Sequence, residues 1–377
     1  KQRLVTIYLW VMKLIITTKQ SKRLIRESLG VPRSIEFWVD SLSSLIKDGL
    51  LMLLSSEDVE VFFNGKDVQE KVVSLGWNSN SSKFKSFPLA EPQLNVRIDV
   101  VPDEDITKGD DYIQSASFDT SDMDVVDATF DDGATLPLFV GGTLNIKLNI
   151  PQSSYDSGSF VELYDSDIRP YAESILFHEL THVFEFYNRI LSGSASPDFE
   201  QVSNLTQMMN KMGVVDDWDE LMFLIYLHLS FELNARVSEV YGLLRNKKIT
   251  SKEEFVEFLR TSRVFSYAKR LNNFSAEGYL KDFEVPQHTI DRVREYDKKE
   301  TPIDDIKNIV LSQFIDNWSQ TYESFLSDFS NDETLKIPKL SPKITSSPEN
   351  FLKFWEKRFN KAGKDSIRKI SRLYSLI

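Results

Sequence analysis

Two histidines separated by one helical turn limit how the middle of this chain can fold. His178 and His182 enclose Glu179 in the sequence HELTH. Residues four apart lie on the same face of an α-helix, so both imidazoles can reach one ion only if this segment is helical. The surrounding residues agree, because apolar side chains recur at helical spacing over residues 170–193. The motif therefore predicts a buried helix with two metal-binding side chains on one face.

The residue types available in the chain narrow the choice of metal and chemistry. The chain has no cysteine, so a metal site must use His, Asp or Glu. Zinc accepts imidazole nitrogen, and its catalytic sites keep one position open for water. We expect His178 and His182 to bind zinc, and Glu179 to act as the base that takes a proton from that water. Two other interpretations stay open: an ordinary core helix whose histidines have protein partners, and a site that binds metal without catalysis.

Two histidines do not complete a zinc site, so a third ligand must come from elsewhere. The extended pattern HExxHxxGxxH is excluded, because Glu185 and Asn188 stand where it needs glycine and histidine. We expect the third ligand to be Glu232, within a helix predicted over residues 218–244, because an unpaired carboxylate among apolar neighbours would be costly. Glu239 is the reserve candidate, and Glu185 is expected to orient an imidazole. The alternative is that Glu232 is a solvated helical residue.

A metallopeptidase also needs a group that stabilises the developing oxyanion. On a continuous helix His228 lies one turn before Glu232 on the same face, so it is the first candidate for this catalytic role. The alternatives are Tyr226, Tyr241 and Arg236. The competing interpretation is that His228 is a structural residue.

The set His178, Glu179, His182 and Glu232 resembles the gluzincin branch of the zincin metallopeptidases. The resemblance covers roughly residues 90–245, and it implies a zinc endopeptidase that hydrolyses peptide bonds. It also implies a small sheet beside the cleft, whose edge strand pairs with extended substrate and which would include residues 143–150. The chain departs from the family at Arg236, where thermolysin-like enzymes have an aspartate that supports a histidine. That support must therefore be built differently.

The two terminal segments are similar to those of uncharacterised HExxH proteins encoded by tailed bacteriophages. This likeness supports a rival to the peptidase: a non-catalytic structural or partner-binding protein, including a component of a phage particle, that retains a zincin fold. Glu179 favours the enzyme, because a binding module has no use for a base. The large share of helix outside the core favours the rival.

Alternating apolar residues mark two half-buried strands before the HELTH helix, at residues 94–100 and 143–150. Gly141-Gly142 predicts a tight hairpin between the second strand and the preceding LPLFV. Other expected elements are a helix over 19–54 broken at 30–32, a strand at 59–65, a loop at 79–92, an acidic solvated loop at 103–132, and helices at 252–259, 303–329 and 348–374.

These elements predict an α+β fold with a zincin-like core and helical extensions at both ends. The expected regions are a mainly helical N-terminal part at 1–78, a catalytic core at 90–245 and a helical C-terminal part at 246–377.

Charge and hydropathy exclude some classes of partner. The chain has 45 basic and 57 acidic residues, a net charge of -12, which argues against a protein that coats nucleic acid. No stretch is apolar enough to cross a membrane. Residues 1–11 lead into no signal-peptide cleavage site, and Met12 is the expected natural start. We therefore expect a cytoplasmic protein that acts on a peptide or protein substrate.

The C-terminal helix has a charge unlike that of the rest of the chain. Between Lys353 and Arg372 it carries eight basic and two acidic residues. We expect its apolar side to pack on the protein while the basic side chains face solvent or the acidic loop. The alternative is that this helix docks on a partner protein or binds nucleic acid through its charge.

Overall fold

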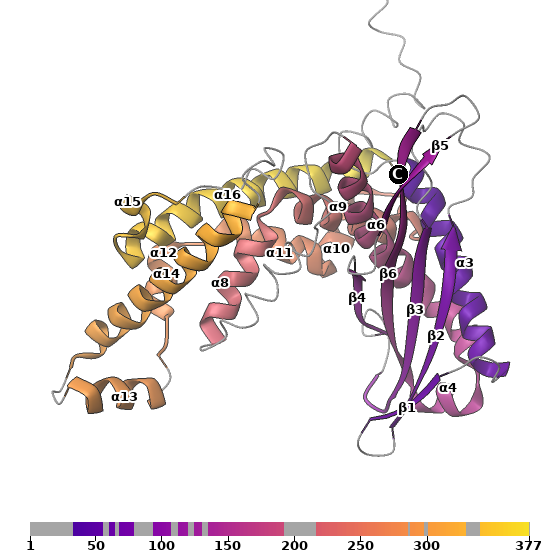
Figure 1. Cartoon of the computed structure of the whole chain (residues 1–377), viewed down its shortest axis with the longest axis horizontal. Coiled ribbons are helices and arrows are strands. Elements are labelled where there is room, and N and C mark those ends of the chain that lie inside the picture. Colours follow the sequence, from indigo (N-terminus) through magenta and orange to yellow (C-terminus); the bar gives the residue numbers. More distant parts are fainter. Residues whose placement is uncertain are drawn as a thin grey trace, which may run out of the picture.

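The protein is a mixed α+β molecule in which a sheet with its covering helices continues into a long helical arm (Figure 1). The computed structural model describes residues 33–55, 60–64, 68–78, 93–106, 112–119, 124–129, 135–191, 216–285, 287–297, 301–328 and 340–376. The α+β class predicted from the sequence is confirmed. The expectations for residues 1–32 and 79–92 lie outside the described residues.

The described strands are β1 (Glu60–Asn64), β2 (Val68–Asn78), β3 (Gln93–Asp103), β4 (Ile113–Asp119), β5 (Asp124–Thr129) and β6 (Thr135–Pro151). The helices of the sheet region are α3 (Arg33–Ser55), α4 (Gln152–Ser157), α5 (Phe160–Leu163), the π-helix η2 (Tyr164–Ile168), α6 (Arg169–Leu191) and α9 (Ser230–Arg245). The remaining helices are α8 (Asp216–Leu227), α10 (Lys252–Thr261), α11 (Arg263–Asn273), α12 (Ala276–Asp282), α13 (Gln287–Asp297), α14 (Ile303–Asp328), α15 (Pro342–Thr345), α16 (Pro348–Arg372) and the 3-10 turn η3 (Leu373–Leu376).

The sheet has the strand order β1-β2-β3-β6-β4, with β5 also paired to β6. Strands β3 and β6 are parallel, and the other pairs are antiparallel. Residues predicted to alternate on one face do so: Val96 pairs with Leu144 and Ile98 with Ile146, and all four are buried. This apolar face packs against α3 and α6, which contribute to the same hydrophobic core.

Strand β6 is continuous, so the hairpin predicted at Gly141-Gly142 is wrong. The glycines make a bulge instead: two steps along β3, from Gln93 to Asn95, face three steps along β6, from Val140 to Thr143. Gly142 takes the left-handed conformation with φ 80°, which glycine adopts without steric cost. As a result, residues 143–150 lie inside the sheet, between β3 and β4, and not at the edge where substrate was expected to bind.

One further prediction fails because sheet partners override the local pattern. The acidic segment 103–132, expected to be a loop, contains β4 and β5. The strand expected at 59–65 is confirmed as β1, whereas β2 was not expected, and it joins the main sheet by pairing with β3. Strand formation in these polar segments depends on an adjacent strand that offers hydrogen bonds, which single-segment periodicity does not record.

The hydrophobic side chains form two cores. The first, here called the sheet core, joins α3, the sheet, α6 and most of α9 to α10 and the C-terminal end of α16. The second, here called the arm core, joins α8, α12, α13 and α14 to the first half of α16. In Figure 1 α16 runs the length of the upper side and connects the two. Hydrophobic packing therefore does not follow the expected boundaries at residues 78 and 245.

Close helix crossings at two glycines hold these cores together. A Cβ added at Gly242 on α9 would lie 2.6 Å from Phe177 and 2.8 Å from the Cα of Ser174, both on α6. A Cβ at Gly363 on α16 would lie 2.3 Å from the backbone nitrogen of Asn272 on α11. Neither position has room for a side chain, so each glycine allows two helix backbones to touch.

The helix predicted over 218–244 is interrupted. Helix α8 ends at Leu227, Leu229 is extended with φ −62° and ψ 137°, and α9 begins at Ser230. The helices predicted at 170–193, 252–259, 303–329 and 348–374 are confirmed as α6, α10, α14 and α16. The break changes which residues share a face with Glu232, and it therefore bears on the candidate site.

Candidate metal centre

The crossing of α6 and α9 brings together the three side chains predicted to bind metal. His178 Nε2 lies 3.2 Å from His182 Nε2. Glu232 Oε2 lies 3.4 Å from His182 Nε2 and 3.7 Å from His178 Nε2. The close contact of α9 with α6 at Gly242 holds these three side chains near one another. Glu232 is completely buried. The three ligand atoms thus form a compact triangle that no exposed side chain contributes to.

The spacing of this triangle fits a metal ion. Tetrahedral zinc with bonds of about 2.0–2.1 Å separates its ligand atoms by about 3.3 Å, close to the three distances observed. Glu232 Oε2 is also buried without a hydrogen-bond partner among the described residues. A buried polar atom usually has a partner, and an ion between the three side chains would supply one. The group His178, His182 and Glu232 could therefore hold a metal ion.

The break between α8 and α9 favours Glu232 as an anion. Because α9 begins at Ser230, Glu232 lies in its first turn, where the helix dipole stabilises negative charge. On the continuous helix expected from the sequence, the same residue would have been in the interior. The structure therefore supplies an electrostatic reason for a buried carboxylate at this position.

Arg236, where the sequence departs from the expected pattern, pairs with the carboxylate of the candidate ligand Glu232. Its Nε donates to Glu232 Oε1 at 2.7 Å, and its Nη1 donates to Glu239 Oε2 at 2.9 Å. Burial raises the pKa of Glu232, but Arg236 and the two imidazoles lower it further, so the net pKa is well below its ordinary value. With Oε1 held by arginine, Oε2 is the oxygen left for a metal.

Glu239, the reserve ligand, supports a histidine instead. Its Oε2 lies 3.4 Å from His178 Nδ1, on the opposite side of the ring from the candidate metal position. Burial raises the pKa of Glu239, while Arg236 and His178 lower it to a net value below the ordinary one. An ionised carboxylate beside Nδ1 favours the tautomer in which Nε2 is free to bind metal. Arg236 and Glu239 thus build the support that sequence reasoning left open, and their i+4 and i+7 spacing from Glu232 was the readable signal.

Glu185, which was expected to orient an imidazole, has a partner on α9. Its Oε1 accepts a hydrogen bond of 2.8 Å from Asn234 on α9, and Lys369 on α16 donates to the same asparagine at 2.6 Å. This chain of contacts connects the C-terminal helix α16 to α6 and α9, the two helices that carry the candidate ligands. No sequence motif indicated it, because the three residues come from distant segments.

Glu179 lies beside the ligands, as the motif predicts. It is 8 % exposed, and burial raises its pKa to about 7, partly offset by His182. Glu232, Arg236 and Glu239 are also close enough to affect that pKa. The carboxyl group is therefore within the electrostatic environment of the candidate metal position.

His228 does not have the position expected of an oxyanion stabiliser. The helix break removes its one-turn relation to Glu232, and its ring packs against Trp355 at 5.0 Å and Phe359 at 5.8 Å in the arm core. Its Nδ1 donates to the backbone carbonyl of Ile225. Burial lowers its pKa to about 4 despite that hydrogen bond, so the imidazole is neutral. The structural interpretation of His228 is the one that these contacts support.

Of the alternatives, Tyr226 is the one that lies at the centre. Burial raises the pKa of its hydroxyl well above the ordinary value, and the neighbouring Glu232 and Glu179 raise it further. Its ring contacts Phe231, which in turn packs against His182. Tyr241, by contrast, donates to Glu36 on α3. Tyr226 is therefore a half-buried, protonated donor beside Glu232 at the candidate metal position.

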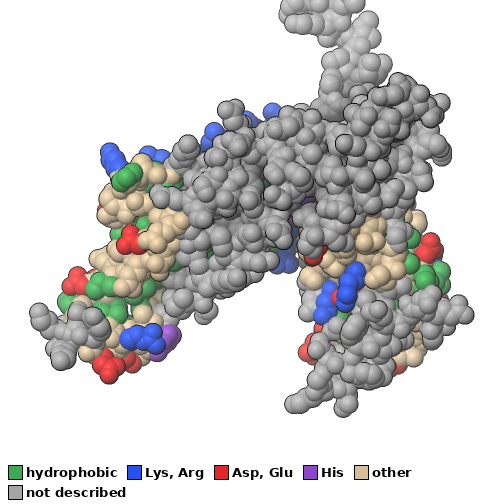
Figure 2. All heavy atoms as spheres, in the orientation of Figure 1, with side chains coloured by type: hydrophobic (Ala, Val, Ile, Leu, Met, Phe, Trp, Pro, Cys, Tyr) green, Lys and Arg blue, Asp and Glu red, His purple; other side chains and the backbone are tan. Residues whose placement is uncertain are grey.

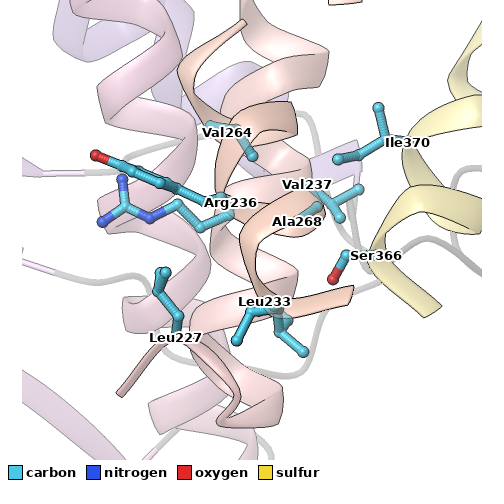
Figure 3. Close-up of a pocket in the computed structure, with 10 residues that line it drawn as sticks. Leu227, Leu233, Arg236, Val237, Val264, Ala268, Ser366 and Ile370 are labelled. Carbon is cyan, nitrogen blue, oxygen red and sulfur yellow. The ribbon is translucent and has the colours of Figure 1, made fainter. Parts of the chain in front are cut away.

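A small apolar cavity lies behind Arg236, between α9, α11 and α16 (Figure 3). Its walls include Val237, Val264 and Ile370, and Tyr267 places its ring 5.9 Å from the Arg236 guanidinium carbon. Figure 3 shows the arginine side chain running along this wall. The aliphatic lining limits access of water to Arg236 from this side, which strengthens its ion pairs with the two glutamates.

No family model, curated protein or solved structure matches this chain. Within the part of the chain that the structure describes, no helix is both long and apolar enough to cross a membrane. The chemistry of the centre is therefore the basis for assigning a function.

Proposed function

We propose that this protein is a zinc-dependent metalloendopeptidase of the gluzincin type. His178, His182 and Glu232 would hold the zinc, and Glu179 would serve as general base. One observation carries the proposal: three ligand atoms are spaced as zinc requires. Two of them belong to histidines on α6, with a glutamate between them in the sequence, and the third belongs to Glu232 on the crossing helix α9. The geometry supports a metal site, and the position of Glu179 supports hydrolysis.

Bound zinc would polarise the scissile carbonyl and make a water molecule more acidic. Glu179 accepts the proton released as water attacks, and then donates it to the leaving amine. Arg236 keeps Glu232 ionised and fixes which oxygen faces the histidines, and Glu239 holds the His178 ring. No covalent intermediate with the protein is required.

Tyr226 is the group best placed to stabilise the oxyanion. Its hydroxyl is protonated and lies near Glu232 and Glu179, so it can donate a hydrogen bond to developing negative charge. This assignment replaces His228, whose contacts are in the arm core. It follows from the position of Tyr226 in the last turn of α8, directly before the break.

The strand that would bind an extended peptide is β4. It lies at the end of the described sheet next to β6 and also contacts α6, the helix of the HELTH motif. An extended substrate could add to it by backbone hydrogen bonds. Ser115 and Ser117 alternate with Ala116 and Phe118 along β4, and the two serines are exposed. This assignment moves the substrate strand from residues 143–150 to residues 113–119.

Substitution of the base tests the proposal. Glu179→Gln keeps the size of the side chain but removes the proton acceptor, so hydrolysis of a mixed-sequence quenched fluorescent peptide library should fall by about 10²–10⁴-fold. Zinc content by elemental analysis should stay at the wild-type value. A matched control is Glu162→Gln, an exposed residue of α5. Cleavage that survives in Glu179→Gln would contradict the assigned base.

The rival function is that of a non-catalytic binding protein with a zincin-like core. The observation that favours it is the arm core, a second hydrophobic core formed mainly by helices that carry none of the three candidate ligands. Under this alternative the wild-type protein binds zinc but cleaves no member of the peptide library. Absence of zinc from wild-type protein supplied with the metal would contradict both functions in their metal-bound form.

A further inference from the structure

Helix α16 presents a row of basic side chains to solvent. The exposed members are Lys353, Lys357, Lys361, Lys364, Arg368 and Arg372. They recur every three or four residues, so they lie on one face of the helix. At 1.5 Å per residue the row is about 29 Å long. Figure 2 shows basic side chains along the upper side of the molecule, where α16 runs in Figure 1. We call these six residues the basic row.

The opposite face of α16 is buried along its whole length, which makes the row rigid. Phe351, Trp355 and Phe359 pack into the arm core, and Ile370 packs into the sheet core. Gly363 lies directly against the backbone of α11. The expectation that the apolar side packs inward while the basic residues face solvent is confirmed for the basic row, whereas Arg358 and Lys369 are half-buried. A rigid helix holds its charges at fixed spacing and loses little entropy when a partner binds.

Most of the basic row lacks an acidic partner within the described residues. Lys353 pairs with Glu349 and Arg368 pairs with Asp365, both exposed pairs on the same helix. The other four members have no ion pair there. Such a row is an exception in a chain of net charge -12. Like charges at this spacing destabilise a helix, so an acidic partner would relieve a cost that the free protein bears.

The form of the row favours an acidic helix over other polyanions. Along α16 the large apolar side chains are buried or half-buried, so there is no platform for stacking bases and no apolar edge to enter a bilayer. The net charge of -12 also repels long polyanions more than a short segment. A second helix with Asp or Glu every three or four residues has the same straight form and the same rise as the row.

We propose that the basic row of α16 is a docking surface for an acidic α-helix of a partner protein. The interaction consists of charge pairs between the row and carboxylates of the same spacing, so it provides orientation and association rate and weakens as salt rises. It does not depend on the metal centre. The proposal therefore stands or fails separately from the proposed peptidase function.

The test compares two triple variants of the full chain with the same change in charge. Lys357→Glu, Lys361→Glu and Lys364→Glu together reverse the centre of the row. Lys248→Glu, Lys252→Glu and Lys281→Glu reverse three exposed lysines outside α16. The probe is a labelled helical peptide of about 20 residues with glutamate every three or four positions, and binding is measured by fluorescence anisotropy at about 50 mM salt. Circular dichroism and zinc content check that both variants fold.

Wild-type protein and the control triple should bind the peptide alike, and the α16 triple should bind it at least about tenfold more weakly. Equal loss in both triples, or no binding by wild type, would overturn the proposal. Duplex DNA of similar length and vesicles containing phosphatidylserine are the competing probes. Preferential binding of either one through the same lysines would overturn the assignment of an acidic helix and identify that polyanion as the partner.

Discussion

Histidines in two regions of this molecule have opposite surroundings. His178 and His182 lie between α6 and α9 with three glutamates and an arginine around them. His228 lies in the arm core between Trp355 and Phe359, with a backbone carbonyl as its polar partner. All three are largely shielded from water. The comparison shows that burial alone does not distinguish a candidate metal ligand from a core histidine, whereas the charges of the neighbouring groups differ between the two regions.

The polar groups of the two regions also have different kinds of partner. At the candidate metal centre Arg236 pairs with Glu232 and Glu239, and Glu232 Oε2 has no hydrogen-bond partner among the described residues. In the arm core the aromatic rings surround His228, and its lowered pKa keeps it uncharged. The candidate metal centre could therefore hold a cation, whereas the surroundings of His228 disfavour a positive charge.

The largest expected difference concerns zinc content. Glu232→Ala removes a ligand and should lose zinc altogether after gel filtration, a greater effect than the roughly 10–100-fold loss typical of a residue that only supports a ligand. His228→Phe should retain the wild-type zinc content, because that ring faces the arm core. Elemental analysis of both variants checks this. Zinc retained in Glu232→Ala, or lost in His228→Phe, would reverse the comparison.

A fall in pH should lower stability through His228, whose surroundings disfavour the protonated ring. Its folded pKa of about 4 is below the ordinary 6.5, so between these values the unfolded chain binds a proton that the folded chain does not. Stability should therefore fall as pH drops from 6.5 to 4, by up to about 3 kcal/mol from this residue. Urea unfolding of metal-free wild type and His228→Phe at several pH values gives the difference. A stability difference between the two proteins that does not change with pH would show that His228 is not buried as a neutral ring.

Substitution of the glycines at the two helix crossings should lower the free energy of unfolding by similar amounts, but it should affect zinc affinity differently. Gly363→Ala and Gly242→Ala each force a methyl group into a neighbouring helix, and each should cost about 1–3 kcal/mol of unfolding free energy. Only Gly242→Ala should also weaken zinc binding, because it moves α9 relative to α6. Thermal unfolding and zinc titration of both variants measure the two effects. Equal zinc affinity in both would mean that the α6–α9 crossing does not set the ligand spacing.

The smallest expected effect is that of a change which preserves charge. Arg236→Lys retains the cation but cannot bridge two carboxylates with a planar group, so zinc affinity should fall by about 10-fold. Arg245→Lys is the matched control, since that guanidinium pairs with Asp40 away from the centre. Competition with a chelating dye measures both. Unchanged affinity in Arg236→Lys would show that its charge matters and its geometry does not.

Local patterns in the sequence predicted those parts of the molecule in which one segment determines its own structure. The spacing of His178, Glu179 and His182 indicated a helix, and the alternation in residues 94–100 and 143–150 indicated two strands. Glu232 could also be selected from the sequence, because a buried carboxylate needs a compensating cation wherever its helix lies. Each of these features depends on the pattern within one segment or on one residue, and for that reason it could be predicted from the sequence.

Only the tertiary structure decided where segments meet. The break before Ser230, which removes His228 from the centre and brings Tyr226 into it, depends on α8 packing into the arm core while α9 crosses α6. The strands β4 and β5 form because β6 offers them hydrogen bonds. Arg236 pairs with Glu232 and Glu239 within α9, but only the crossing brings these carboxylates beside His178 and His182. Sequence periodicity records which face of an element is buried, whereas the partner that buries it is a long-range choice that no single segment encodes.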